Sequence, residues 1–234
     1  MSKTNEYQQH LERLEKEENL SPQDRKFKAH IDCSRVKYRA AARDLLHELG
    51  GKGFQISVIK ELRESKVKYL EAIPILIKWL PRVTYRPLKK DIVRTLSQPW
   101  AKLSAEVLID EFKNSTSEED KNYRWIVGDA LVPVVRKNHF NQLAEIVRDR
   151  SAGFTRQMVM VALGKTKHPK AAEVLMEVLQ AGDEVGHAMD GLRRLKAKVP
   201  RELIMPQLTH EFPWVRKEAK KLLALQDKLD AAET

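Results

Sequence analysis

The residues that most readily bind metals or act as bases and nucleophiles are seven scattered histidines and a single cysteine. No H-E-x-x-H or G-x-S-x-G sequence occurs, so neither a zinc protease nor a serine hydrolase motif is present. Cys33 stands alone, which excludes an intramolecular disulfide and a multi-cysteine zinc site. The sequence therefore predicts no catalytic residue, no metal and no cofactor, although a site assembled across repeats would leave no local motif.

The sequence is instead rich in positively charged residues. The chain has 43 Lys and Arg against 33 Asp and Glu, for a net charge of +10. This balance favours an acidic partner, such as nucleic acid, an anionic membrane surface or an acidic protein, without choosing among them. Four of these cations each stand seven residues before a leucine that closes a helical pattern. They are Lys89, Arg124, Arg156 and Arg216.

Helices are the elements that must position these charges. Gly and Pro number only 9 and 10 in 234 residues, while charged residues reach 32%, a composition typical of amphipathic helices. The phrases SAEVLIDEF and AAEVLMEVL place apolar residues on one helix face. Apolar positions recur about every 32 residues in two series: Leu76, Leu108, Leu143, Leu175 and Ile204, then Leu96, Leu131, Leu163, Leu192 and Leu223.

Two stretches carry a resemblance to a known family. TRQMVMVALGKTKHPKAAEVLMEVL (155–179) and FPWVRKEAKKLLAL (212–225) resemble HEAT-like repeats of the phycobilisome-lyase type. The shared marks are a basic residue that opens the second helix, a small residue and Leu that close it, and Pro-x-Ala-x-x-x-Leu that opens the next pair. The resemblance covers about Tyr69 to Leu225 and implies an all-α fold, an α-solenoid of about five helix pairs. It says almost nothing about function, because such repeats serve scaffolding, protein binding, nucleic-acid binding and occasionally catalysis.

We expect three segments along the chain. Residues 1–68 form an irregular helical N-terminal cap, residues 69–225 the HEAT-like repeats, and residues 226–234 a polar C-terminal tail that frays. In the cap, Ser21-Pro22-x-Asp24 is typical of a helix start, and this helix is expected to reach Leu49. Gly50–Gly53 would end it, and a further helix is expected from Ser57 to Glu64.

The recurrent cations border the apolar stripe of each second helix. We interpret them as a structural ladder that bonds to acids or carbonyl groups of neighbouring turns, as arginines in HEAT-type repeats commonly do. A row of cations that faces a ligand is the alternative.

A second stripe of residues on the second helix of each pair lies farther from the apolar core positions. We expect this stripe to line a concave groove. Its candidate binding residues are Lys90, Arg94, Trp125, Asp129, Asp190, Lys217 and Lys221. The two ends are basic and the middle contains acids, whereas a continuous phosphate-binding track needs cations along its length. Among the four tryptophans, Trp125 is the best candidate for ligand contact.

Two hypotheses for function follow. The first is a non-catalytic adaptor, monomeric and cytoplasmic, that binds a protein partner in the concave groove and does not bind membranes. The alternative is a nucleic-acid-binding protein, because the expected solenoid looks like that of bacterial alkylpurine DNA glycosylases, although their motif residues have no match here. The position of the excess cations in three dimensions should separate the two hypotheses.

Overall fold

The computed structural model describes residues 3–16 and 20–232. Within these residues all regular structure is helical and no strand occurs, which confirms the all-α prediction. The N-terminal part holds α1 (Lys3–Lys16), α2 (Pro22–Gly50) and α3 (Lys60–Glu64). The helices that follow are α4 (Ala72–Trp79), α5 (Arg86–Leu96), α6 (Ala105–Asn114), α7 (Lys121–Leu131), α8 (Phe140–Arg148), α9 (Gln157–Lys165), α10 (Ala171–Ala181), α11 (Val185–Leu195), α12 (Arg201–Ile204) and α13 (Pro213–Ala231).

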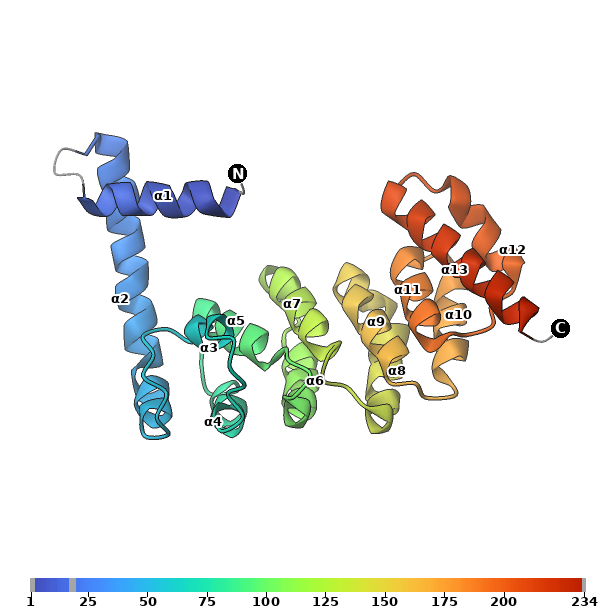
Figure 1. Ribbon diagram of the computed structural model, residues 1–234, viewed down its shortest axis with the longest axis horizontal. Coiled ribbons are helices and arrows are strands. Elements are labelled where there is room, and N and C mark those ends of the chain that lie inside the picture. The colour runs from blue at the N-terminus through green and yellow to red at the C-terminus, as the bar shows by residue number, and fades with distance from the viewer. Residues whose placement is uncertain (1–2, 17–19, 233–234) are drawn as a thin grey trace.

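Short 3-10 turns connect several of these helices. They are η1 (Lys102–Ser104), η2 (Glu118–Asp120), η3 (Lys137–His139), η4 (Arg150–Arg156) and η5 (Met205–Thr209). From α4 onward the helices form consecutive pairs, and the second helices pack on one another in the order α5, α7, α9, α11 and α13. Figure 1 shows a curved row in which these second helices lie on the inner side. The row therefore brings residues about 32 positions apart in sequence next to each other.

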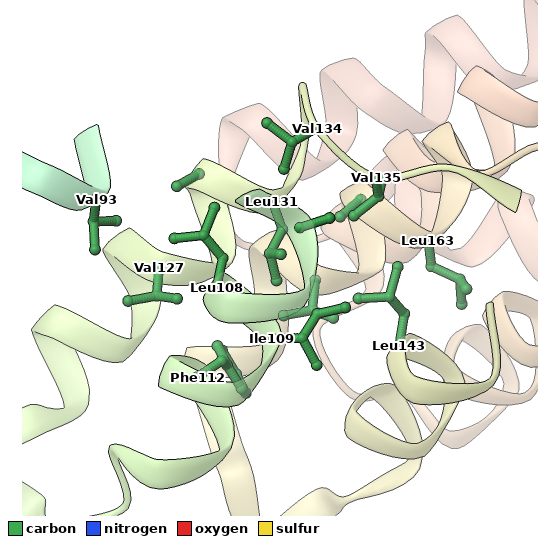
Figure 2. Close-up of a cluster of buried hydrophobic side chains, with 14 of the residues drawn as sticks. Val93, Leu108, Ile109, Phe112, Val127, Leu131, Val134, Val135, Leu143 and Leu163 are labelled. Atoms are coloured by element: carbon green, nitrogen blue, oxygen red, sulfur yellow. The ribbon is translucent and has the colours of Figure 1, made fainter. Parts of the chain in front are cut away.

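The core follows the two leucine series. All five positions from Leu76 to Ile204 are fully buried, and so are Leu96, Leu131, Leu163 and Leu192. In α13 the buried position belongs to Leu222, whereas Leu223 is half-buried. Figure 2 shows how Leu108, Leu131, Leu143 and Leu163, from four successive helices, gather in one cluster. Each pair thus buries its apolar side against its neighbours.

The N-terminal cap contains a helix that leaves the row. The Ser21 hydroxyl accepts a hydrogen bond from the Asp24 amide at 3.1 Å and starts α2. The buried residues of α2 all lie in its last third, at Ala42, Leu45 and Leu49, so its first half stands away from the row and carries α1 (Figure 1). The next helix begins at Lys60 rather than at Ser57.

The C-terminal end differs from the expected polar tail. Helix α13 continues to Ala231 because Gln226 is buried and ties it to the loop between α11 and α12. The Gln226 side chain accepts from the Val199 amide at 2.9 Å and donates to the Ala197 carbonyl at 3.1 Å. Of the expected tail, residues 226–231 are helical, and residues 233–234 lie outside the described part of the chain.

Helices α9 and α11 touch backbone to backbone, and this contact generates a prediction. A Cβ atom at Gly164 would lie 2.7 Å from the Gly191 Cα, closer than real Cβ atoms approach. Gly164→Ala should therefore force the helices apart and lower the free energy of unfolding by ~1–3 kcal/mol, measured by urea denaturation.

Gly50→Ala is the matched control, because a Cβ at Gly50, in the last turn of α2, meets no atom within 4 Å. It should be neutral or slightly stabilising, as alanine is favoured over glycine in helices. Equal stability of Gly164→Ala and the parent protein would contradict the close contact.

Candidate binding face

The predicted groove residues lie on the second helices of the row, and we call these seven side chains the inner stripe: Lys90 and Arg94 on α5, Trp125 and Asp129 on α7, Asp190 on α11, and Lys217 and Lys221 on α13. Arg94, Asp129, Lys217 and Lys221 are exposed, and the other three are half-buried. The stripe separates into three parts with different chemistry.

The middle of the inner stripe is a hydrogen-bonded chain of neutral and acidic groups. The Trp125 indole donates to the Gln157 side chain at 3.0 Å, and the Gln157 amide donates to the Glu184 carboxylate at 2.6 Å. The chain links α7, α9 and the residue before α11. Because the indole N–H already has a protein partner, Trp125 serves to join adjacent helix pairs and offers a ligand only part of its ring.

The C-terminal part of the inner stripe is a network of ion pairs. Asp190 pairs with Arg193 and, at 2.9 Å, with Arg194. Arg193 also reaches Glu218 on α13 at 3.2 Å, and Glu218 pairs with Lys221. These cations are therefore largely neutralised within the fold.

The N-terminal part leaves its charges unpaired. Neither Lys90 nor Arg94 has an ion-pair partner among the described residues. Asp129 lies near Arg94, and loss of hydration raises the pKa of the Asp129 carboxyl while the Arg94 charge partly opposes this rise. The Asp129 side chain still retains solvent exposure, so this effect on its charge is modest.

The three arginines of the predicted ladder bond to backbone carbonyl groups near the end of the preceding helical segment. Arg124 donates to the Phe112 carbonyl at 3.1 Å, Arg156 to the Val147 carbonyl at 2.5 Å, and Arg216 to the carbonyls of His210 and Glu211 at 2.7 and 2.8 Å. The last carbonyls of a helix lack intrahelical partners. Each guanidinium therefore satisfies acceptors at the turn within its own pair.

Lys89 bonds to an acid of the next pair. Its ammonium group reaches forward to Glu111 at 2.6 Å, as Arg156 also reaches forward to Asp183 at 3.4 Å. Glu111 is buried, at 6% exposure, and also accepts from the Tyr123 hydroxyl at 2.9 Å. The Arg86 guanidinium stacks over the Tyr123 ring, 4.2 Å from its centroid. Glu111 was not foreseen from the sequence, where its only signal is an acid next to Phe112 on the apolar side of α6.

A groove opens where α2 leaves the row. It has a volume of about 920 Å³ and lies between α2, the start of α3 and the start of α5. Its apolar lining includes Phe27, Ile31, Tyr38 and Tyr85. At its base the Tyr38 hydroxyl donates to Asp91 at 2.8 Å, and burial and the Asp91 charge raise the Tyr38 pKa. The groove shares α5 with Lys90 and Arg94 and was not foreseen from the sequence.

His187 is a half-buried titratable group at the far end of the row. Its ring packs 4.9 Å from the ring of Trp214, which in turn covers Gly186. Burial lowers the pKa of His187, while Glu184, Asp190 and Glu218 partly oppose this effect. The folded protein therefore holds this imidazole in its neutral form.

The described residues contain no group of three or more His, Cys, Asp or Glu side chains placed to hold a metal ion. None of the described helices is long and apolar enough to cross a membrane. Comparison with known proteins found no family model that matches the chain and no matching sequence among curated proteins.

The ladder contacts predict a cost for removing Arg156, which is 3% exposed. Arg156→Ala should lower the free energy of unfolding by ~1–3 kcal/mol, because the Val147 carbonyl loses its donor. Arg156→Lys should recover only part of this loss, since lysine lacks the planar fork. Thermal and urea unfolding measure both.

Arg25→Ala is the control for Arg156, since Arg25 is exposed on α2 and its side chain makes no ion pair among the described residues. It should change stability by no more than ~0.5 kcal/mol. If Arg156→Ala unfolds like Arg25→Ala, the ladder is not structural.

The lowered pKa of His187 predicts that stability depends on pH. An unfolded histidine takes up a proton near pH 6.5, whereas folded His187 does so only at lower pH. The unfolded state therefore binds more protons as the pH falls from about 7 to 5.5, and the free energy of unfolding should decrease by up to ~1.4 kcal/mol per pH unit.

His187→Gln should flatten this slope between pH 7 and 5.5, and His30→Gln, at an exposed position of α2, should keep it. Urea unfolding at closely spaced pH values tests both variants. A slope that is the same in all three proteins would show that another group is responsible.

Proposed function

We propose that this chain is a non-catalytic scaffold of HEAT-like repeats, an α-solenoid, that binds a protein partner along the inner stripe and the groove beside α2. The paired helices, their period of about 32 residues and the stacking of the second helices on the inner side support the repeat assignment. We further propose a monomeric, cytoplasmic protein, a compartment that suits the lone Cys33.

The observation that carries this proposal is the apolar groove together with the mixed charge of the inner stripe. Its aromatic and aliphatic lining at Phe27, Ile31, Tyr38 and Tyr85 suits apolar side chains. Around the inner stripe, Arg193, Arg194 and Lys221 are already paired with Asp190 and Glu218. A surface that carries both positive and negative charges and has an apolar groove favours binding of a protein segment.

The charges near the groove indicate the chemistry of that segment. Arg39 lines the groove and is exposed, and Lys90 and Arg94 follow on α5. None of the three forms an ion pair among the described residues. The partner we propose is an amphipathic segment whose apolar side chains enter the groove and whose acidic side chains face these cations.

The alternative, nucleic acid bound along the inner stripe, has less support. Lys217 is exposed and forms no ion pair with the described residues, but its neighbour Lys221 pairs with Glu218. The middle of the stripe holds the Trp125–Gln157–Glu184 chain. In such a complex the carboxylates of Glu184 and Glu218 would lie against phosphate groups. Cations are therefore not continuous along this face, as a phosphate-binding track requires.

Ile31→Asp tests the proposal, because Ile31 lines the groove and belongs to the first half of α2, which stands away from the row. A buried charge in the groove should weaken partner binding at least tenfold, or ~1.4 kcal/mol, while circular dichroism and the melting temperature stay close to the parent values. Partners are first captured from nuclease-treated lysate of the source cells, and affinity is then measured with the purified partner.

Val36→Asp is the matched control on the same helix. Val36 is 66% exposed and does not line the groove, so this variant should bind the partner like the parent protein. The proposal fails if Ile31→Asp and the parent bind with equal affinity, or if nuclease treatment abolishes every capture.

A further inference from the structure

The excess positive charge lies along one edge of the helix row. This edge consists of the loops that leave one pair and enter the next, and we call the five segments 65–71, 97–104, 132–139, 165–170 and 196–200 the basic edge. They contain one acid, Glu71, and ten cations: Lys66, Lys68, Lys102, Arg136, Lys137, Lys165, Lys167, Lys170, Lys196 and Lys198. Ten cations and one acid give this edge a charge of +9, out of the net charge of +10 of the whole chain.

Neighbouring loops of the basic edge contact one another along the row. The ring of Tyr69 meets that of Trp100 at 6.0 Å, which joins the first loop to the second. Lys102 donates to the Pro133 carbonyl and joins the second to the third. Phe140, which directly follows the third loop, stacks on His168 of the fourth at 3.8 Å. The first four of these loops, and the cations that they carry, therefore lie side by side along the row.

Most of these cations have no acidic partner in the part of the chain that the structure describes. Among the described residues, only Lys198 of the ten forms an ion pair, with Asp230 at 3.9 Å. Lys102 has lost hydration and lies near Arg136 and Lys165, and both effects lower its pKa. Like charges thus accumulate here while carboxylates pair with cations elsewhere, as at Arg148–Glu177. This repulsion is a cost that an external anion would relieve.

The backbone supplies an independent observation. Four non-glycine residues of the described chain have positive φ, and three of them are lysines of the basic edge: Lys66, Lys167 and Lys196, at 57°, 53° and 56°. Each stands just after a helix, where glycine is the preferred residue because it has no Cβ. The chain keeps a lysine at each of these positions despite the conformational cost.

Helix dipoles do not account for the row. Cations are favourable at helix C-termini, and α5, α7, α9 and α11 end at this edge. The same loops, however, lead into the N-termini of α6, α8, α10 and α12, where positive charge is unfavourable. Lys170 directly precedes α10, for example. The gain at one helix end is offset at the next.

We propose that the basic edge binds the phosphate backbone of double-stranded nucleic acid without reading its sequence. A row of cations matches a line of phosphates. The aromatic rings of the edge are engaged with each other, Trp100 with Tyr69 and Phe140 with His168, and so do not offer a platform for the bases of a single strand. Exposed large apolar side chains occur only in its first two loops, at Val67, Leu70 and Leu103, whereas a membrane surface would favour them along the whole edge.

The three lysines with positive φ allow a test that should leave the fold unchanged. In the triple variant Lys66→Gly/Lys167→Gly/Lys196→Gly, each glycine adopts the positive φ without strain. The melting temperature should therefore stay unchanged or rise. Binding of the full chain to a fluorescent 20-base-pair duplex of random sequence should weaken at least tenfold at about 0.1 M salt. The slope of log K against log salt should fall by about 2–3, close to one for each lost phosphate contact.

The matched control removes the same charge from other exposed positions: Lys26→Gln/Lys37→Gln/Lys220→Gln. It should leave affinity within about twofold and the salt slope unchanged. Equal weakening by the control would overturn the proposal, because net charge alone would then explain binding. Tighter binding to a single strand, to phosphatidylserine vesicles or to polyglutamate than to the duplex would also overturn it.

This proposal does not rest on the protein-binding groove. Ile31→Asp should bind the duplex like the parent protein, and the glycine triple variant should bind the protein partner like the parent. Failure of one activity is thereby distinguished from failure of the other.

Discussion

Short helices are the constraint on which this architecture depends. From α4 to α12 no helix is longer than 11 residues, and isolated helices of fewer than ~12 residues are marginal in water. Each pair is therefore stable only when its neighbours cover its apolar side. The contact of Gly164 with Gly191 is the closest case, because it brings two second helices together with no side chain between them. Close stacking of the second helices then determines which residues can form a common inner face.

Short helices also expose many unpaired carbonyl groups, and this explains the use of arginine. Arg124 and Arg156 each bond to a carbonyl in the last turn of the helix before them. The guanidinium groups lie at the turn within a pair, whereas most cations of the loops between pairs form no ion pair with the described residues. Cations that stabilise the fold and most cations that form no such pair thus lie at opposite ends of the same helices.

The helical fold and its core could be predicted because they depend on local periodicity. Leu108 and Leu143 are buried because an apolar residue every three or four positions makes one helix face. The chemistry of the inner stripe could not be predicted, since the Trp125–Gln157 bond depends on how two helices are aligned. The burial of Glu111 and the left-handed conformation of Lys167 likewise depend on neighbours that sequence spacing does not reveal. The C-terminal boundary was missed because one glutamine, Gln226, makes two bonds to a distant loop.

The two proposed surfaces follow different physical rules within one fold. The groove beside α2 occurs where the row ends, so its affinity depends on a few apolar side chains such as Phe27 and Ile31. The basic edge repeats with every pair, and the free energy of releasing counterions grows with each added phosphate contact. The groove lies between helices and the edge at helix ends, and the two surfaces share no residue. A scaffold built in this way would hold a specific protein segment at its N-terminal end while its remaining length binds a polyanion with little specificity.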